Sequence, residues 1–162
     1  MKNRRPNGQL TNLEGTFSNE TRSLIVIPAR GGSKGIPRKH LSQIHGKSLV
    51  SWCLQVAVEV PQAIVLLSSD DDEILSQASG HPEVMLRTRP HHLASDSSDD
   101  QSVLIDAISF AESQLGTNLN EILMLQPTSP SRTIHTVLSC RDHFRKGGYT
   151  SVWTVEPISP KV

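Results

Sequence analysis

Short apolar runs of strand length alternate with helical periodicities along most of this 162-residue chain. The first run is Leu24–Ala29, and the segment from Leu49 then repeats apolar residues with the i, i+3, i+4 spacing of a helix packed on one side. Strands separated by helices predict a parallel sheet covered on both faces, as in doubly wound folds. We therefore predict a three-layer α/β domain with a mostly parallel sheet and Rossmann-like nucleotide-binding topology.

The same signals place the other elements. Ser48 stands where the N-cap of the first helix belongs, and Pro61 closes that element. Further strands are predicted at 63–67, 84–86, 121–125 and 150–155, and further helices at 71–78, across 103–111 and at 133–146. Residues 1–22 show no apolar period, so we predict a flexible N-terminal extension followed by one domain over 23–162.

The overall charge excludes several classes of partner. Lysine plus arginine number 16, and aspartate plus glutamate also number 16, so net charge gives no support for a nucleic-acid or membrane partner. No run reaches the roughly 18 apolar residues of a membrane span, and the N-terminus lacks the apolar core of a signal peptide. Cys53 and Cys140 are far apart and are expected to be free thiols. These features predict a cytoplasmic protein.

The distribution of charge is more informative than its sum. No acidic residue lies between Glu20 and Glu59, whereas six lysines and arginines do: Arg22, Arg30, Lys34, Arg38, Lys39 and Lys47. Within this interval the segment 29–35, ARGGSKG, follows the first strand. Its glycines let backbone N–H groups approach an anion, and its cations can neutralise a triphosphate. The spacing is neither GxxxxGK[ST] nor GxGxxG, so we predict a nucleotide phosphate loop of another type, with a solvated basic face as the alternative.

Four segments in order resemble the acylneuraminate cytidylyltransferases, the CMP-sialic acid synthetases. Residues 27–40, IPARGGSKGIPRKH, resemble the signature loop of that family. Residues 68–71 (SSDD), 89–96 (RPHHLASD) and 125–133 (LQPTSPSRT) resemble its later motifs. The resemblance covers residues 23–162 and implies a fold of the nucleotide-diphospho-sugar transferase type.

The resemblance also implies a reaction. CTP and a nonulosonic acid such as N-acetylneuraminate would give the CMP-sugar and pyrophosphate with Mg²⁺, through attack of the anomeric hydroxyl on the α-phosphorus. The catalytic residues it implies are Arg30, Lys34 and Lys39, which would hold the triphosphate and the leaving pyrophosphate. Nucleotide-binding positions are Ala29, Arg30, Gly31, Gly32, Ser33, Lys34, Lys39, His40, Ser69, Arg89 and Ser95, and sugar-binding positions are Gln126 and Lys161.

Some positions keep a simpler interpretation. Asp70 and Asp71 are expected either to cap a helix or to assist a metal. Asp96 is read as a turn or cap residue as readily as a functional one, and Gln126 with Pro127 has the alternative of simply ending a strand.

The sequence departs from the family pattern in two places. His40 stands where the family commonly has asparagine, and the family continues past the point that matches Val162 with its dimerisation element and metal-binding aspartates. Mg²⁺ is therefore expected without its usual ligands, no metal residue is assigned, and the homodimer of the family is expected to lack its dimer element here. Two alternatives stay open: a truncated CTP-binding remnant without catalysis, and a 3-deoxy-octulosonate cytidylyltransferase, against which Gly31–Gly35 argue. The choice among sialic, legionaminic and pseudaminic acids is not settled by these residues.

Overall fold

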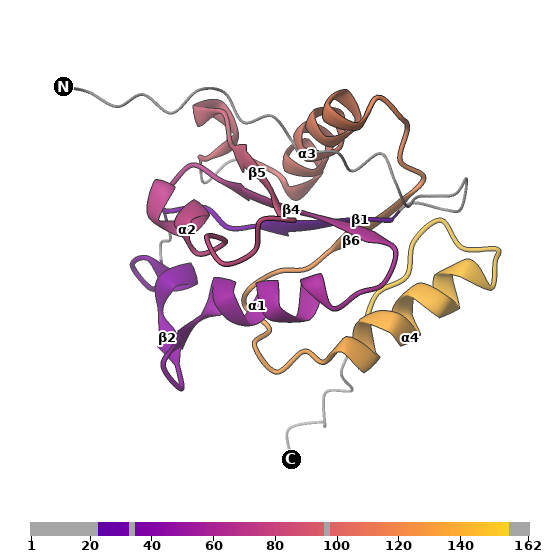
Figure 1. Cartoon of the computed structure of the whole chain (residues 1–162), viewed down its shortest axis with the longest axis horizontal. Helices are drawn as coiled ribbons and strands as arrows, with labels where there is room; N and C mark the ends of the chain where they lie inside the picture. The colour runs from indigo at the N-terminus through magenta and orange to yellow at the C-terminus, as the bar shows by residue number, and fades with distance from the viewer. Residues whose placement is uncertain (1–22, 33–34, 96–97, 156–162) are drawn as a thin grey trace, which may run out of the picture.

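Strand β1 (Ser23–Pro28) lies inside a four-stranded sheet in a computed structural model that describes residues 23–32, 35–95 and 98–155 (Figure 1). The strand order is β5–β4–β1–β6, and every neighbouring pair is parallel. The other strands are β4 (Ala63–Ser69), β5 (Met85–Thr88) and β6 (Glu121–Met124). The predicted α/β fold with a parallel sheet is thus confirmed, and the carboxyl ends of these strands share one edge of the sheet.

Both faces of β1 are buried, which explains its unbroken apolar sequence. Leu24 and Val26 pack in one cluster with residues of helix α3 (Asp100–Leu115). Ile25 and Ile27 belong to a second cluster that includes α1 (Leu49–Val58). Figure 1 shows α3 on one side of the sheet and α1 and α4 on the other. The predicted three layers are therefore present.

The predicted helices are present, and their ends differ by a few residues from the predicted bounds. Ser48 caps α1 as predicted, because its side chain accepts a hydrogen bond from Ser51 N at 3.1 Å. Helix α2 (Asp72–Ser76) is shorter than the predicted 71–78. Helix α4 (Ile134–Arg145) follows the N-cap Thr133 and matches the predicted 133–146.

A small hairpin was not predicted. Strands β2 (Gln43–Ile44) and β3 (Lys47–Ser48) pair antiparallel, and both turn residues have positive φ, 50° at His45 and 78° at Gly46. The usual sequence signal for this turn is Asn-Gly or Asp-Gly, and histidine in the first position hid it. Two short 3-10 turns, η1 (Lys39–Leu41) and η2 (His91–Leu93), are also present.

The predicted strand at 150–155 is wrong. These residues have no strand structure, and Trp153 is 75% exposed. After Gly147 and Gly148, both with positive φ, the chain turns back along α4. The Tyr149 ring stacks on His143 of that helix with ring centroids 5.1 Å apart. A strand forms only when a neighbouring strand pairs with its backbone, and this segment pairs with no strand of the described sheet, although the edge strands β5 and β6 each have a single partner.

Both cysteines are free thiols, as expected. Cys53 is buried in the core, and this burial raises the pKa of its thiol to about 11. Among the helices that the structure describes, none has the length and apolar character needed to cross a bilayer. The predicted extension, 1–22, lies outside the described residues.

Candidate nucleotide-binding site

Two adjoining cavities lie at the carboxyl edge of the sheet, where doubly wound folds bind ligands. Their volumes are about 220 and 170 Å³. Pro28, Arg30, Arg89 and Asp100 line both cavities. The first is completed by Leu93, Ser95, Ser98 and Val103, and the second by Lys39, His40, Gln126, Pro127 and Thr128. Three of the four sequence motifs therefore contribute directly to one concave region.

The glycine loop is anchored by the motif after β4. Ala29 is fully buried, and its N–H donates to Ser68 O at 3.0 Å, which extends the β1–β4 ladder. Gly31 N then donates to Asp70 Oδ1 at 2.9 Å. Asp71 caps α2 by accepting from Glu73 N at 2.8 Å. Both aspartates thus act on backbone N–H groups, which favours their interpretation as anchors and caps.

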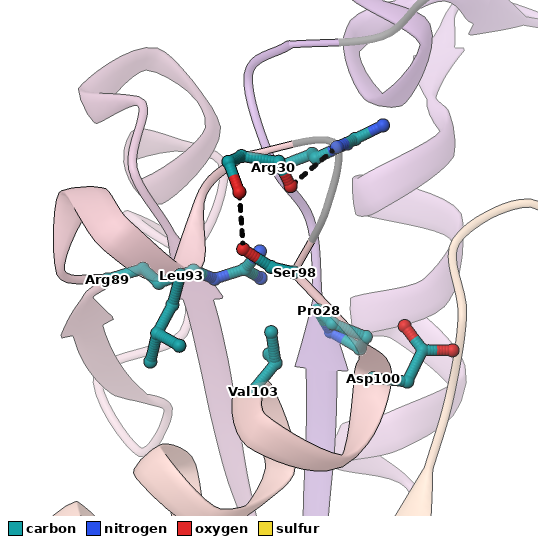
Figure 2. Close-up of a pocket in the computed structure, with 8 residues that line it drawn as sticks. Pro28, Arg30, Arg89, Leu93, Ser98, Asp100 and Val103 are labelled. Carbon is teal, nitrogen blue, oxygen red and sulfur yellow. Dashed lines mark hydrogen bonds between the residues drawn. The ribbon is translucent and has the colours of Figure 1, made fainter.

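Arg30 crosses the mouth of the first cavity. Its Nη1 donates to Ser95 O at 3.1 Å, so it links the glycine loop to the RPHHLASD motif (Figure 2). Ser95 Oγ in turn lies 2.9 Å from Ser98 Oγ. Two residues predicted to bind nucleotide from different motifs are therefore in direct contact.

Arg89 is a buried cation, with 6% of its surface exposed. Its Nε donates to Ser68 Oγ at 3.1 Å and its Nη2 donates to Ser68 O at 2.9 Å. Figure 2 shows its guanidinium reaching into the cavity near Ser98 and Val103. Burial lowers the pKa of Arg89, because the charged form loses hydration there. An anion bound in the cavity would restore favourable interactions for this charge.

Lys39 and His40 come from turn η1, on the glycine-loop side of the second cavity. His40 is 8% exposed, and its Nδ1 lies 3.0 Å from Arg30 O. Burial, followed by the charges of neighbouring cations, lowers the pKa of His40. The adjacent Arg38 has a φ of 51° and pairs with Asp71 at 3.2 Å and Glu73 at 2.7 Å, so its charge is directed toward α2.

Gln126 faces the second cavity from the end of β6. Its Nε2 lies 3.4 Å from Asp100 Oδ2, and its backbone oxygen accepts from Arg132 Nη1 at 3.1 Å. An amide can donate to and accept from hydroxyl groups, which suits recognition of a sugar. Gln126 follows β6, which ends at Met124, and it also lines the second cavity, so the simpler interpretation does not account for it fully.

The remaining predicted residues are placed differently. Ser69 is fully buried, and its Oγ accepts from Asp71 N at 3.0 Å, so it supports the turn and lines neither cavity. Gly31 and Gly32 lie in the loop beside the cavities without lining them. Ser33, Lys34, Asp96 and Lys161 lie outside the described residues.

Sequence reasoning missed Asp100, Ser98 and Thr128, which all line the site. Thr128 belongs to a motif that the sequence singled out, and only Gln126 was chosen from it. Asp100 begins α3 and looked like an ordinary helix-start acid. The polar segment before α3 was the available signal for these residues. It follows the end of β5 closely, so the chain must cross the carboxyl edge of the sheet there before α3 begins.

The described residues do not fit a resident magnesium site. Within 23–32, 35–95 and 98–155, no three histidine, cysteine, aspartate or glutamate side chains gather to hold a metal ion. Asp100 is the one carboxylate that the described lining supplies, and it faces the amide of Gln126. Mg²⁺ prefers oxygen ligands and commonly keeps several waters and substrate phosphates in its shell.

Replacement of Gly31 by alanine is expected to lower thermal stability. A Cβ at Gly31 would lie 2.9 Å from both Cβ and Oδ2 of Asp71, so the cap of α2 must shift. Overpacking of this kind costs about 1–3 kcal/mol. Gly32→Ala is the matched control, because no atom lies within 4 Å of the added Cβ. Thermal unfolding followed by circular dichroism measures both, and equal melting temperatures for the two variants would contradict the close packing at Gly31.

The sequence is similar to several curated proteins of known activity. It is 33% identical over 141 residues to CMP-N,N'-diacetyllegionaminic acid synthase of Legionella pneumophila, which covers 86% of this chain and 60% of that protein. It is 38% identical over 96 residues to pseudaminic acid cytidylyltransferase of Campylobacter jejuni, covering 57% of this chain and 40% of that protein. It is 34% identical over 132 residues to N-acylneuraminate cytidylyltransferase of Oncorhynchus mykiss, covering 80% of this chain and 29% of that protein. The chain therefore spans 60% or less of the length of these relatives.

Solved structures share the fold at low sequence identity. CMP:2-keto-3-deoxy-manno-octonic acid synthetase complexed with CTP matches with a TM-score of 0.60 at 22% identity, over 78% of this chain and 48% of that one. 4-Diphosphocytidyl-2C-methyl-D-erythritol synthase matches with a TM-score of 0.63 at 10% identity, over 80% of this chain and 57% of that one. A family model described as cytidylyltransferase matches residues 24–150, which include β1 from Leu24 onward, the glycine loop and every residue that lines the cavities. The chain belongs to the cytidylyltransferase family.

Proposed function

We propose that this chain binds CTP at the carboxyl edge of its sheet and transfers CMP to a nonulosonic acid, with release of pyrophosphate. One observation carries the proposal: Arg30, Lys39 and Arg89 converge on two adjoining cavities beside a glycine loop. A triphosphate carries several negative charges, and guanidinium groups bind phosphate oxygens through two parallel hydrogen bonds. The names of the curated relatives, which act on legionaminic, pseudaminic and acylneuraminic acids, support a sugar of this class.

Within the proposal the two cavities have different tasks. The first, with Arg89, Ser95 and Ser98, holds the cytidine part of CTP. Lys39 and Arg30 hold the phosphates where the cavities meet, and they stabilise the charge that develops on the phosphate oxygens during transfer. Gln126 faces the sugar from the second cavity. Lys34, Ser33 and Lys161 stay predictions for the same site, since they lie outside the described residues.

Mg²⁺ is expected to bind to this site together with CTP. When bound, it would neutralise phosphate charge and orient the leaving pyrophosphate. Since the described residues gather no metal-binding cluster, we expect the ion to depend on the CTP phosphates for much of its shell. A cytoplasmic location is part of the proposal, because both cysteines are unpaired thiols.

A second candidate function is CTP binding without turnover. It is favoured by the composition of the cavity lining, in which Asp100 is the one carboxylate that the described residues supply beside several cations. Both candidates require the same cationic cavities, so nucleotide binding alone does not separate them.

Calorimetry with CTP, paired with an assay of pyrophosphate release, tests the proposal. CTP is expected to bind more tightly than UTP, and more tightly with Mg²⁺ than without it. Addition of CTP with N-acetylneuraminate, N,N'-diacetyllegionaminate or pseudaminate in separate reactions is expected to release pyrophosphate with one of them. Binding without release with any sugar would support the second candidate, and failure to bind CTP would contradict both.

A further inference from the structure

The glycine loop and turn η1 are both attached to the turn that connects β4 to α2. On the side of the glycine loop, Gly31 N donates to Asp70 Oδ1 at 2.9 Å. A Cβ added to Gly31 would lie 2.9 Å from Asp71 Cβ, so the loop backbone packs directly on that side chain. On the side of η1, Arg38 Nη2 donates to Asp71 Oδ2 at 3.2 Å. Gly31 and Arg38 are therefore attached to neighbouring aspartates of one turn.

Asp71 uses its two carboxylate oxygens for different tasks. Oδ1 accepts from Glu73 N at 2.8 Å and caps α2, while Oδ2 accepts from Arg38. Glu73 Oε2 lies 2.7 Å from the same arginine nitrogen, so one guanidinium joins two carboxylates at the start of α2. We call Arg38, Asp71 and Glu73 the clamp. Because the Asp71 side chain is only 23% exposed, solvent screens this contact less than it screens a pair on the open surface.

The backbone at Arg38 depends on this contact. Arg38 precedes η1 in the left-handed region, with φ 51° and ψ 36°. That conformation is unfavourable for a residue with a Cβ and persists where surrounding contacts hold it. The next residue, Lys39, lines the second cavity, and His40 of the same turn has its Nδ1 3.0 Å from Arg30 O. A relaxed backbone at Arg38 would therefore displace both cations that face the phosphates.

We propose that the clamp positions Lys39 and Arg30 for the phosphates of CTP without itself contacting the nucleotide. This inference rests on the proposed function of the site. The three clamp residues line neither cavity, so their effect reaches the nucleotide through Gly31 and η1. A site that is ordered before binding loses less conformational entropy when the ligand arrives, and its affinity is higher for that reason.

Charge alone predicts the opposite effect for Asp71. This carboxylate packs against the glycine loop, so its removal would by charge alone strengthen the binding of a triphosphate. Asp71→Asn keeps an oxygen that caps α2, since asparagine is as good a cap as aspartate, and its Nδ2 cannot accept from Arg38. We expect the affinity for CTP to fall about three- to fivefold, the upper part of what an exposed ion pair contributes, because the clamp opens.

Calorimetric titration with CTP, with and without Mg²⁺ and below the melting temperature of each variant, tests the clamp. Arg38→Met should weaken binding by a similar factor, and Arg38→Lys should weaken it less because the charge remains. The double variant Arg38→Met/Asp71→Asn should bind no more weakly than the weaker single variant, because both substitutions remove the same contact. In turnover these variants should raise KM for CTP and leave kcat nearly unchanged. Asp72→Asn, the same change at the exposed residue that begins α2, is the matched control and should not weaken binding.

Amide hydrogen exchange gives a readout that needs no nucleotide. Leu41 N and Ser42 N close η1 by donating to Arg38 O at 2.9 Å and Lys39 O at 3.0 Å. Both amides should exchange faster in Arg38→Met and in Asp71→Asn than in the wild type, because η1 opens more often.

The outcomes separate the clamp from the proposed function. Failure of the wild type to bind CTP would contradict the proposed function, and the role of the clamp in binding with it. A wild type that binds CTP while Asp71→Asn binds it as tightly or more tightly would overturn the clamp alone. So would additive losses in the double variant, or unchanged amide exchange at Leu41 and Ser42. A loss of affinity in Asp71→Asn that occurs only with Mg²⁺ would identify Asp71 as a metal ligand and would also overturn the clamp.

Discussion

Replacement of Arg145 by methionine is expected to lower the free energy of unfolding by about 2–3 kcal/mol. Glu121 at the start of β6 is 4% exposed, and Arg145 near the end of α4 donates to its two oxygens at 2.6 and 3.0 Å. Ser23 at the start of β1 donates to the same carboxylate. Without Arg145 the buried charge keeps only the serine, and an uncompensated buried charge is costly. The estimate is below the full range for buried pairs because the Arg145 side chain is 31% exposed.

Urea unfolding at neutral pH measures this change through the transition midpoint. Lys146→Met, at an exposed position next in sequence, is the control and should change stability by less than about 0.5 kcal/mol. Adding Glu121→Gln to the Arg145 variant should recover most of the loss, since the buried charge is then gone. An Arg145 variant that unfolds at the wild-type midpoint would show that the ion pair does not hold α4 to the sheet.

The ion pair shows which part of the fold the sequence could not predict. Periodicity placed β6 and α4 correctly because each pattern is local, with apolar residues at spacing set by the strand or the helix. The contact among Ser23, Glu121 and Arg145 joins positions 98 and 122 residues apart, and no local pattern encodes it. The wrong strand at 150–155 has the same origin, because strand formation depends on a partner elsewhere in the chain.

The residues that line the cavities were easier to predict from the sequence than the residues that hold the surrounding backbone in place. The loop with Arg30 and Lys39 was selected because it follows the first predicted strand, and Arg89 and Gln126 were selected from the family resemblance. The parallel sheet brings all four to one edge. The sequence could not tell which polar groups turn inward to hold the backbone. Ser69 therefore supports a turn instead of lining a cavity, and Asp100, which was not selected, lines both.

Replacement of Arg89 by methionine is expected to weaken CTP binding by about 10- to 100-fold, the equivalent of the 1.5–3 kcal/mol typical of a hydrogen bond to a charged group. The guanidinium lines both cavities and is held by two hydrogen bonds to Ser68, so little orientation entropy is lost when an anion binds. Arg89→Lys keeps the charge without the fork and should fall between the methionine variant and the wild type. Calorimetric titration with CTP, below the melting temperature of each variant, measures the effect.

The control for this experiment must be a substitution that destabilises the fold to a similar extent at a residue outside the cavities. Arg87 on β5 provides it, because Arg87 binds both oxygens of Asp106 at 3.0 and 2.7 Å, stacks over Phe110, and lines neither cavity. Arg87→Met should therefore destabilise the fold while leaving the affinity for CTP unchanged. Equal losses of affinity in the Arg87 and Arg89 variants would mean that Arg89 acts only through the stability of β5. A loss confined to Arg89 would identify its buried charge as part of the nucleotide site.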